Sequence, residues 1–125
     1  MKRVILDTNF LIMPYQFGVD IFEDIPKVVL EEHEIVTLGG VIRELEHLAK
    51  SKGKDSLAAR IGLELVTRKG IRVVHAEEKD VDDAIIGLSD QETIVATNDK
   101  GLMKRLKHKN VKILYLRGKN RLELG

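Results

Sequence analysis

Acidic side chains follow the apolar stretches of this sequence at four places along the chain. The stretch VILDTNF runs from three aliphatic residues directly into Asp7, and Asp99 closely follows a second apolar stretch, TIVAT. Glu44 comes six residues after a third stretch, EIVTL, and the pair Asp82 and Asp83 lies downstream of a fourth, IRVVH. Carboxylates in this position can act together on a substrate or a cation if the fold brings the ends of these stretches together.

Each of these acids has an ordinary structural explanation when it is considered alone. Asp7 and Asp99 are suited to cap helices or turns, and acids near residue 82 offset a helix dipole. Glu44 is suited to pair with a nearby lysine. Four carboxylates that converge in one cleft would instead repel one another by several kcal/mol per close pair where solvation is weak. Convergence would therefore require a cation among them.

The donor types favour a hard divalent cation. The sequence contains no cysteine, which excludes disulfides, thiolate catalysis and Cys-based zinc or iron–sulfur sites. Its four histidines are scattered without His-x-x-x-His spacing, and neither a P-loop nor a Gly-x-Gly-x-x-Gly motif occurs. Carboxylate oxygens suit Mg²⁺ or Mn²⁺ better than zinc or copper. We therefore predict a site for Mg²⁺ or Mn²⁺ among the acids Asp7, Glu44, Asp82, Asp83 and Asp99.

The elements that must position these acids alternate between strand and helix patterns. Short β-branched stretches predict strands at residues 3–6, 34–38, 71–75, 93–97 and 111–116. Helical spacing between them predicts helices at residues 22–33, 40–52, 56–70, 81–91 and 101–109. The alternation predicts an α/β sandwich with a central, mainly parallel sheet. Because parallel strands end at one edge, the acids that follow them should gather there.

Length and charge indicate one globular domain with a polyanionic partner. The chain of 125 residues is 43% hydrophobic and 33% charged, so we expect a single domain over residues 1–125, without signal peptide or membrane segment, in the cytoplasm. Residues 1–99 hold 12 Lys or Arg against 19 Asp or Glu, whereas the basic segment 100–125 holds 9 against Glu123 alone. A nucleic acid bound near a metal ion would match both the acidic part and the basic segment of the chain, although a solvated basic surface explains the charge equally well.

Four stretches of the sequence resemble, in order and spacing, the acidic motifs of PIN-domain ribonucleases. They are VILDTNFLI, GGVIRELEHL, VDDAIIGLS and IVATNDKGLMKRL, and the likeness extends from residue 3 to about residue 117. The resemblance implies a three-layer α/β/α fold and an acidic site that binds one or two divalent ions. Carried over residue by residue, it implies that the catalytic acids are Asp7, Glu44, Asp83 and Asp99.

The acid pair requires a choice, and polar neighbours accompany two of the acids. Asp83-Ala84-Ile85-Ile86 matches the family pattern of an acid, a small residue and a later aliphatic residue, so we favour Asp83 and assign Asp82 to a metal-bound water. Beside the other acids, the family places polar residues where this chain has Thr8, Asn9, Thr97 and Asn98. These side chains either orient carboxylates and contact phosphate or simply cap the local backbone.

The resemblance implies Mg²⁺- or Mn²⁺-dependent hydrolysis of RNA phosphodiester bonds, with a 5′-phosphate and a 3′-hydroxyl as products. The substrate would be single-stranded or structured RNA, such as ribosomal or transfer RNA. A basic surface would bind the RNA backbone with little base specificity. The predicted RNA-binding residues are Lys104, Arg105, Lys107, Lys109, Arg117, Lys119 and Arg121.

Two branches of the family compete for this chain. The stretches IRELEHL, DDAI, IVATNDKGLMKRLK and VKILYLRGKNRLEL look more like the archaeal and eukaryotic branch that processes small-subunit ribosomal RNA. VapC toxins of toxin–antitoxin pairs form the second branch, whose members more often end soon after the last strand. The first branch implies pre-ribosomal proteins as partners and the second an antitoxin, and a homodimer is compatible with either.

Two functions of other classes stay open at this stage. A PIN fold can serve as a non-catalytic RNA- or protein-binding scaffold, and measurable metal-dependent cleavage would eliminate that alternative. A flap-type DNA nuclease also uses clustered acids, but such enzymes carry a longer helical arch than 125 residues accommodate. Ribose and deoxyribose versions of one oligonucleotide separate the two nuclease types.

Overall fold

The predicted parallel sheet is present in the computed structural model, which describes residues 1–118 and 120–125. Its strands lie in the order β3-β2-β1-β4-β5-β6. The strands are β1 (Lys2–Leu6), β2 (His33–Leu38), β3 (Arg72–Val74), β4 (Thr93–Ala96), β5 (Lys112–Arg117) and β6 (Arg121–Leu124). All pairings from β3 to β5 are parallel, and β6 pairs antiparallel with β5. The α/β class with a mainly parallel sheet is thus confirmed.

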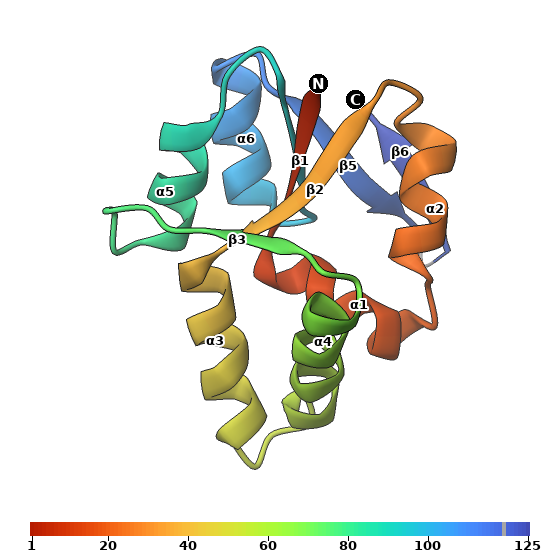
Figure 1. Ribbon diagram of the computed structural model, residues 1–125, viewed down its shortest axis with the longest axis vertical. Coiled ribbons are helices and arrows are strands. Elements are labelled where there is room, and N and C mark those ends of the chain that lie inside the picture. The colour runs from red at the N-terminus through yellow and green to blue at the C-terminus, as the bar shows by residue number, and fades with distance from the viewer. Residues whose placement is uncertain (119) are drawn as a thin grey trace.

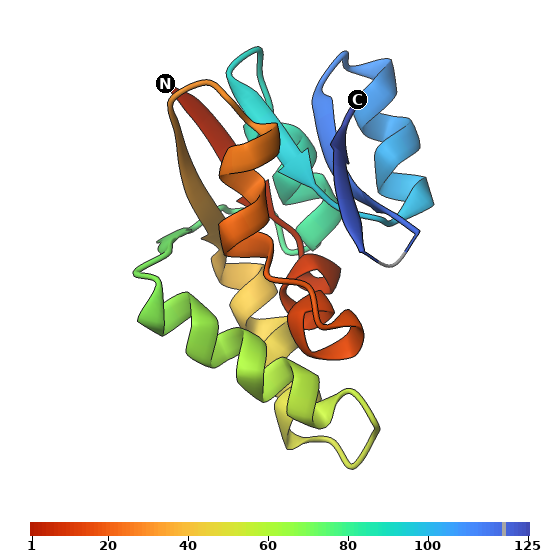
Figure 2. The same ribbon diagram turned by 90° about the vertical axis from the view of Figure 1, so that its right-hand side faces the viewer.

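Helices cover both faces of this sheet. They are α1 (Thr8–Phe17), α2 (Ile21–Val28), α3 (Gly39–Lys50), α4 (Ser56–Arg68), α5 (Val81–Leu88) and α6 (Lys100–His108). In Figure 1, α5 and α6 lie on one side of the strands and α2 on the other, which makes the three layers. Figure 2 shows α3 and α4 extending past the carboxyl ends of the strands. Among the described residues, no helix has the length and apolar character that crossing a membrane requires.

The strand register aligns the ends of the three central strands. Leu6 of β1 pairs with Thr37 of β2 on one side and with Ala96 of β4 on the other. Residues 4–6 and 94–96 are all buried, because both faces of a parallel sheet are covered by helices. Asp7 and Thr97, the residues that follow these two strands, therefore lie side by side at the carboxyl edge of the sheet.

Two observed elements were absent from the sequence prediction, namely α1 and β6. The α1 residues Phe10 to Met13 are all buried, so the segment shows no polar face from which helical periodicity could be recognised, and Pro14 further obscures it. Strand β6 lies in what the charge pattern indicated as a basic segment. The helix predicted over 22–33 is wrong in its last part, because His33 already begins β2.

A close helix contact places α1 at the carboxyl edge. At Gly62 in α4, a Cβ atom would lie only 2.5 Å from the carbonyl oxygen of Leu11 in α1. Glycine inside a helix costs about 1 kcal/mol of stability relative to alanine. Here the missing side chain lets α4 approach the backbone of α1 closely. This packing holds α1 so that its first turn, beside Asp7, lies at the ends of β1 and β4.

Candidate active site

Asp7 is the buried centre of the acidic cluster. Its backbone N–H donates to the carbonyl of Ala96, 3.1 Å away, which continues the pairing of β1 with β4. One carboxylate oxygen accepts from the backbone N–H of Asn9 at 2.8 Å and so caps α1. The other accepts from the hydroxyl of Thr97 at 2.5 Å, and the residue is only 6% exposed. Asp7 is therefore both a helix cap and a buried carboxylate at the sheet edge.

Thr97 links Asp7 to Asp99. The Thr97 hydroxyl donates to Asp7 and accepts from the backbone N–H of Asp99 at 3.0 Å. Asp99 in turn caps α6, because its Oδ1 accepts from the backbone N–H of Leu102 at 2.9 Å. One buried hydroxyl thus fixes the separation of two carboxylates that come from different strands.

Glu44 reaches the same edge from α3. Its Oε2 accepts from the hydroxyl of Thr8 at 3.0 Å, in the first turn of α1. Glu44 is exposed, so this hydrogen bond is what directs its carboxylate. It lines a hollow of about 420 Å³ together with the side chains of Arg43, His47 and Lys79. The sequence analysis missed these three residues, and basic residues flanking a predicted acidic position were the available signal.

The two acids at the start of α5 have different surroundings. Asp80 caps this helix by accepting from the backbone N–H of Asp83 at 3.0 Å, which fixes the rotation of the first turn. The Asp83 carboxylate forms an ion pair with Arg105 at 2.8 Å and is 57% exposed. Asp82 is partly buried and its pKa is raised, first by burial and then by repulsion from Asp99 and other acids. These contacts favour Asp82 over the sequence-based choice of Asp83 as the acid that faces the cluster.

Burial and repulsion together act on the pKa of Asp7. The pKa of Asp7 is raised to about 6, chiefly by burial and to a smaller extent by repulsion from Asp82 and Asp99. The hydrogen bonds from Thr97 and Asn9 only partly oppose this rise. A carboxylate in these surroundings is stabilised by any cation that enters the cluster.

The donor set fits a hard divalent ion by its chemistry, since it consists of carboxylate oxygens. Among the residues that the structure describes, no three acids or histidines approach closely enough to form a complete metal shell. Asp7 is buried and held by two hydrogen bonds, whereas Glu44 and Asp99 are exposed and each accepts one hydrogen bond. Glu44 and Asp99 would have to approach Asp7 to complete a metal shell.

Comparisons with known proteins identify the family of this chain. The family model described as "PIN like domain" matches residues 4–119. The chain belongs to the PIN-domain family. Ribonuclease VapC4 of Methanocaldococcus jannaschii is 33% identical over 129 residues, which cover 99% of this chain and 97% of that protein. Ribonuclease VapC9 of Archaeoglobus fulgidus is 29% identical over 98% of this chain and 88% of its own length.

Solved structures show the same PIN fold. The PIN domain endonuclease Utp24 superposes with a TM-score of 0.77 at 25% identity, covering 98% of this chain and 90% of that one. VapBC-1 from nontypeable Haemophilus influenzae gives a TM-score of 0.56 at 14% identity over 89% of this chain and 96% of that one, which shows the fold alone. Both branches of the family that the sequence suggested are therefore represented among its relatives.

The polar neighbours of the acids in this PIN domain have distinct roles. Thr8 and Thr97 each donate a hydroxyl to a carboxylate. Asn9 contributes its backbone N–H to Asp7. The Asn98 side chain bridges to Leu116 of β5, donating to its carbonyl at 2.9 Å and accepting from its N–H at 2.7 Å. Two of the four thus orient acids through their side chains, and Asn98 joins the site loop to the sheet.

The predicted RNA-binding residues differ in their partners. Arg105 pairs with Asp83, and the Lys109 ammonium donates to the carbonyl of Ile86. Glu123 pairs with Arg117 at 3.2 Å and approaches Arg121 at 3.7 Å. Lys119 lies outside the described residues. Lys104, Lys107 and Arg117 line one groove beside α6, together with Lys100, which was not among the predicted residues.

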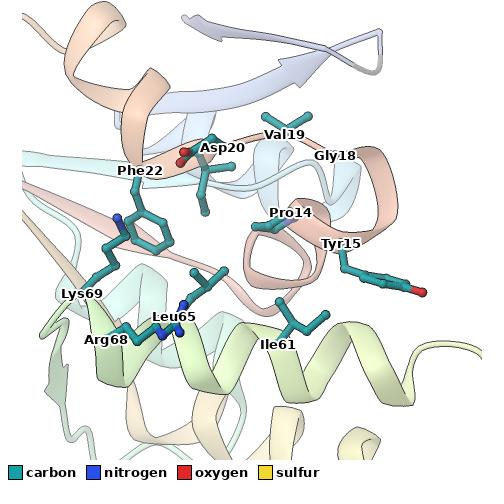
Figure 3. A pocket seen from close by; sticks show the side chains of 11 residues that line it. Pro14, Tyr15, Gly18, Val19, Asp20, Phe22, Ile61, Leu65, Arg68 and Lys69 are labelled. Carbon is teal, nitrogen blue, oxygen red and sulfur yellow. The ribbon is translucent and has the colours of Figure 1, made fainter.

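A separate pocket of about 570 Å³ lies between α1, α2 and α4 (Figure 3). Pro14, Phe22 and Leu65 line it, and the ammonium of Lys69 lies 5.8 Å from the centre of the Phe22 ring. None of the described residues that line it is an acid of the cluster. This pocket is thus distinct from the acidic site.

Asp7→Asn should stabilise the metal-free protein at neutral pH. The pKa of Asp7 in the folded protein, about 6, exceeds the ordinary value of 3.8, so folding favours the protonated carboxyl. This stabilisation is fully present below pH 4 and is lost as the pH rises through 6. The difference corresponds to about 3 kcal/mol. Urea unfolding in EDTA should therefore show the variant more stable than wild type at pH 7.5, with the gap closing towards pH 4.

The control for this series is Glu46→Gln on the exposed side of α3. It removes one negative charge without touching the cluster, so its stability should follow wild type at each pH. An Asp7→Asn gap that is equally large at pH 4 and pH 7.5 would contradict the raised pKa.

Thr97→Val should weaken divalent-ion binding. The substitution keeps the shape of the side chain but removes the donor to Asp7, so the pKa of Asp7 should rise further and the carboxylate should lose its orientation. Loss of an orienting partner of this kind costs roughly 10- to 100-fold in metal affinity. Calorimetric titration with Mn²⁺ measures the effect, and Thr97→Ser, which retains the hydroxyl, should bind like wild type. Equal affinity in the valine variant would remove Thr97 from the site.

Proposed function

We propose that this PIN domain is a divalent-metal-dependent endoribonuclease whose metal site consists of Asp7, Glu44, Asp82 and Asp99. The observation that carries this proposal is the buried Asp7 carboxylate, whose pKa is raised by burial and by two neighbouring acids at the carboxyl edge of the sheet. A structural cap alone does not require burial beside other acids. The ribonuclease names of the two VapC relatives support the same activity.

The residues of the cluster have separable tasks in this proposal. When bound, Mg²⁺ or Mn²⁺ would lower the pKa of a water and stabilise charge on phosphate oxygens. Asp7, at the rigid sheet edge, and Asp82 and Asp99, at two helix starts, would hold the ion. Glu44, directed by Thr8, would either complete the ligand set or accept a proton from the attacking water. Asp83 holds Arg105 and stays outside the ligand set.

The substrate in this proposal is RNA, bound through its phosphates. Exposed cations flank the acids on two sides, near Glu44 and beside α6. Phosphate contacts of this kind position a strand without reading its bases, and they weaken steeply with salt. Within this activity we favour processing of ribosomal RNA, because the stretches IRELEHL and VKILYLRGKNRLEL resemble that branch.

Asp82→Asn should abolish metal-dependent cleavage, whereas Asp83→Asn should retain most of it. Of the two residues, Asp82 is the one whose charge raises the pKa of Asp7, and the amide at position 83 loses mainly an exposed ion pair with Arg105, which contributes little to stability. The assay follows cleavage of a labelled RNA oligonucleotide with Mn²⁺, with Mg²⁺ and with EDTA. The reverse order of activities would assign the site to Asp83.

The same assay with a deoxyribose version of the oligonucleotide separates this proposal from a DNA nuclease. Preferred cleavage of the deoxyribose strand would favour the flap type of enzyme. Absence of cleavage of either strand in any divalent metal would favour a binding scaffold.

The 33% identity with VapC4 over nearly the whole chain supports a second role, as the toxin of a toxin–antitoxin pair with an antitoxin partner. Inducible expression in a bacterial host distinguishes the roles. A processing enzyme should leave growth unchanged, because its precursor substrate is missing there. A toxin should arrest growth, and Asp7→Asn should relieve that arrest.

A further inference from the structure

The guanidinium of Arg105 in α6 lies beside acids that belong to α5, the neighbouring helix in Figure 1. It donates to a carboxylate oxygen of Asp83 at 2.8 Å, although the two residues are 22 positions apart in the chain. This hydrogen bond raises the pKa of Arg105, and the charges of Asp83, Asp82 and Asp80 raise it further. Arg105 therefore faces three acids around the first turn of α5 rather than one partner alone.

Asp82 connects this arginine to the acidic cluster. Burial and repulsion from Asp99 raise the pKa of Asp82, whereas the charge of Arg105 lowers it. Asp82 in turn contributes to the raised pKa of Asp7. The guanidinium is thus close enough to act on Asp82, which is a metal ligand in the proposed function.

The contact between Arg105 and Asp83 can open without repacking of the core. Their side chains are 46% and 57% exposed, and ion pairs with this exposure contribute little to stability. Lys109, one turn further along α6, donates separately to the carbonyl of Ile86 in α5. Since this second contact also joins the two helices, Arg105 can change its partner while α6 stays in place.

A guanidinium and a divalent ion are alternative partners for the same carboxylate. Each stabilises the negative charge of Asp82, but two cations beside one carboxylate repel each other. Because Asp83 binds the guanidinium directly, it also draws Arg105 away from Asp82. The strength of the Asp83 contact therefore affects how readily a metal ion can occupy the site.

We propose that Arg105 is an internal counter-cation of the acidic site, that it competes with the divalent ion for Asp82, and that Asp83 limits this competition by holding the guanidinium. Asp83 is then a positioning residue, which affects the metal affinity through Arg105 without binding the metal itself. This inference rests on the metal site of the proposed function. It adds a regulation of that site, because the free metal concentration at which the site fills depends on the pair of Arg105 and Asp83.

The first test measures Mn²⁺ affinity by calorimetry in the absence of RNA. Arg105→Gln should bind Mn²⁺ more tightly than wild type, by roughly 3- to 10-fold, because it removes one positive charge next to a ligand. The matched control is Lys104→Gln, which removes the same charge from an exposed neighbour that lines the groove beside β5. The control should tighten binding less. No tightening in Arg105→Gln, or equal tightening in both variants, would overturn the proposal.

The second test separates Asp83 as a positioning residue from Asp83 as a ligand. Asp83→Asn should weaken Mn²⁺ binding by roughly 3- to 10-fold, because the released guanidinium pairs with Asp82 instead, and excess metal should overcome the loss. Adding Arg105→Gln to Asp83→Asn should restore the affinity to about the wild-type value. Asp83→Glu retains a carboxylate for Arg105 and should bind nearly as wild type does. An equal loss from Asp83→Asn with and without Arg105 would identify Asp83 as a ligand and overturn its positioning role.

A third measurement follows the guanidinium of the wild-type protein directly. In nitrogen–proton NMR spectra, the Nε–H signal of Arg105 is assigned by its loss in Arg105→Gln. This signal should shift as Mg²⁺, which is diamagnetic, is titrated into the protein. An unchanged signal at saturating Mg²⁺ would show that the metal does not affect Arg105, and would overturn the proposal.

The outcomes for this inference and for the proposed function are distinguishable. Urea unfolding in EDTA shows whether each variant is folded before its affinity is interpreted. Saturable Mn²⁺ binding that responds neither to Arg105→Gln nor to Asp83→Asn would overturn only this inference. Absence of Mn²⁺ binding in the wild-type protein would overturn both the proposed metal site and the role of Arg105.

Discussion

Burial of the Asp7 carboxylate is the constraint on which the rest of this site depends. The side chain follows the central strand of a parallel sheet, so the same helices that bury β1 also remove Asp7 from water. An ion in that position is unfavourable unless hydrogen bonds and a cation stabilise it. The hydroxyl of Thr97 and the backbone N–H of Asn9 supply these hydrogen bonds, and they also fix the direction of the carboxylate.

The remaining acids are arranged around this fixed point by short, local hydrogen bonds. Thr97 couples Asp7 to Asp99, and Thr8 couples α1 to Glu44. The caps at the starts of the helices therefore serve two purposes, since the same groups that satisfy backbone N–H donors also position acids. Asp7 is buried and held by two hydrogen bonds, whereas Glu44 and Asp99 are exposed. This difference is compatible with a metal shell that closes only around a bound ion.

Positive charge lies close to the acids. Arg105 pairs with Asp83, while Asp82 lies near Asp99 and Glu44. Lys100, Lys104 and Lys107 of α6 line a neighbouring groove. In the proposed function, this separation would let a polyanion bind without neutralising the ligands of a metal. The apolar pocket between α1, α2 and α4 lies apart from both.

The sequence by itself determined the α/β class, the parallel sheet and the acids at its edge, because β-branched stretches and helical spacing are local properties that need no tertiary contact. It did not reveal α1, whose consecutive residues Phe10 to Met13 are all buried, or β6, a short strand that pairs with β5. Adjacent positions such as 82 and 83 are equivalent in a sequence pattern. Only the tertiary structure gives their side chains different surroundings, because Arg105 from a distant helix pairs with Asp83 whereas Asp82 is partly buried near Asp99. For the same reason, only the packing of α6 against β5 decided which cations of the basic segment line a common groove and which are paired elsewhere.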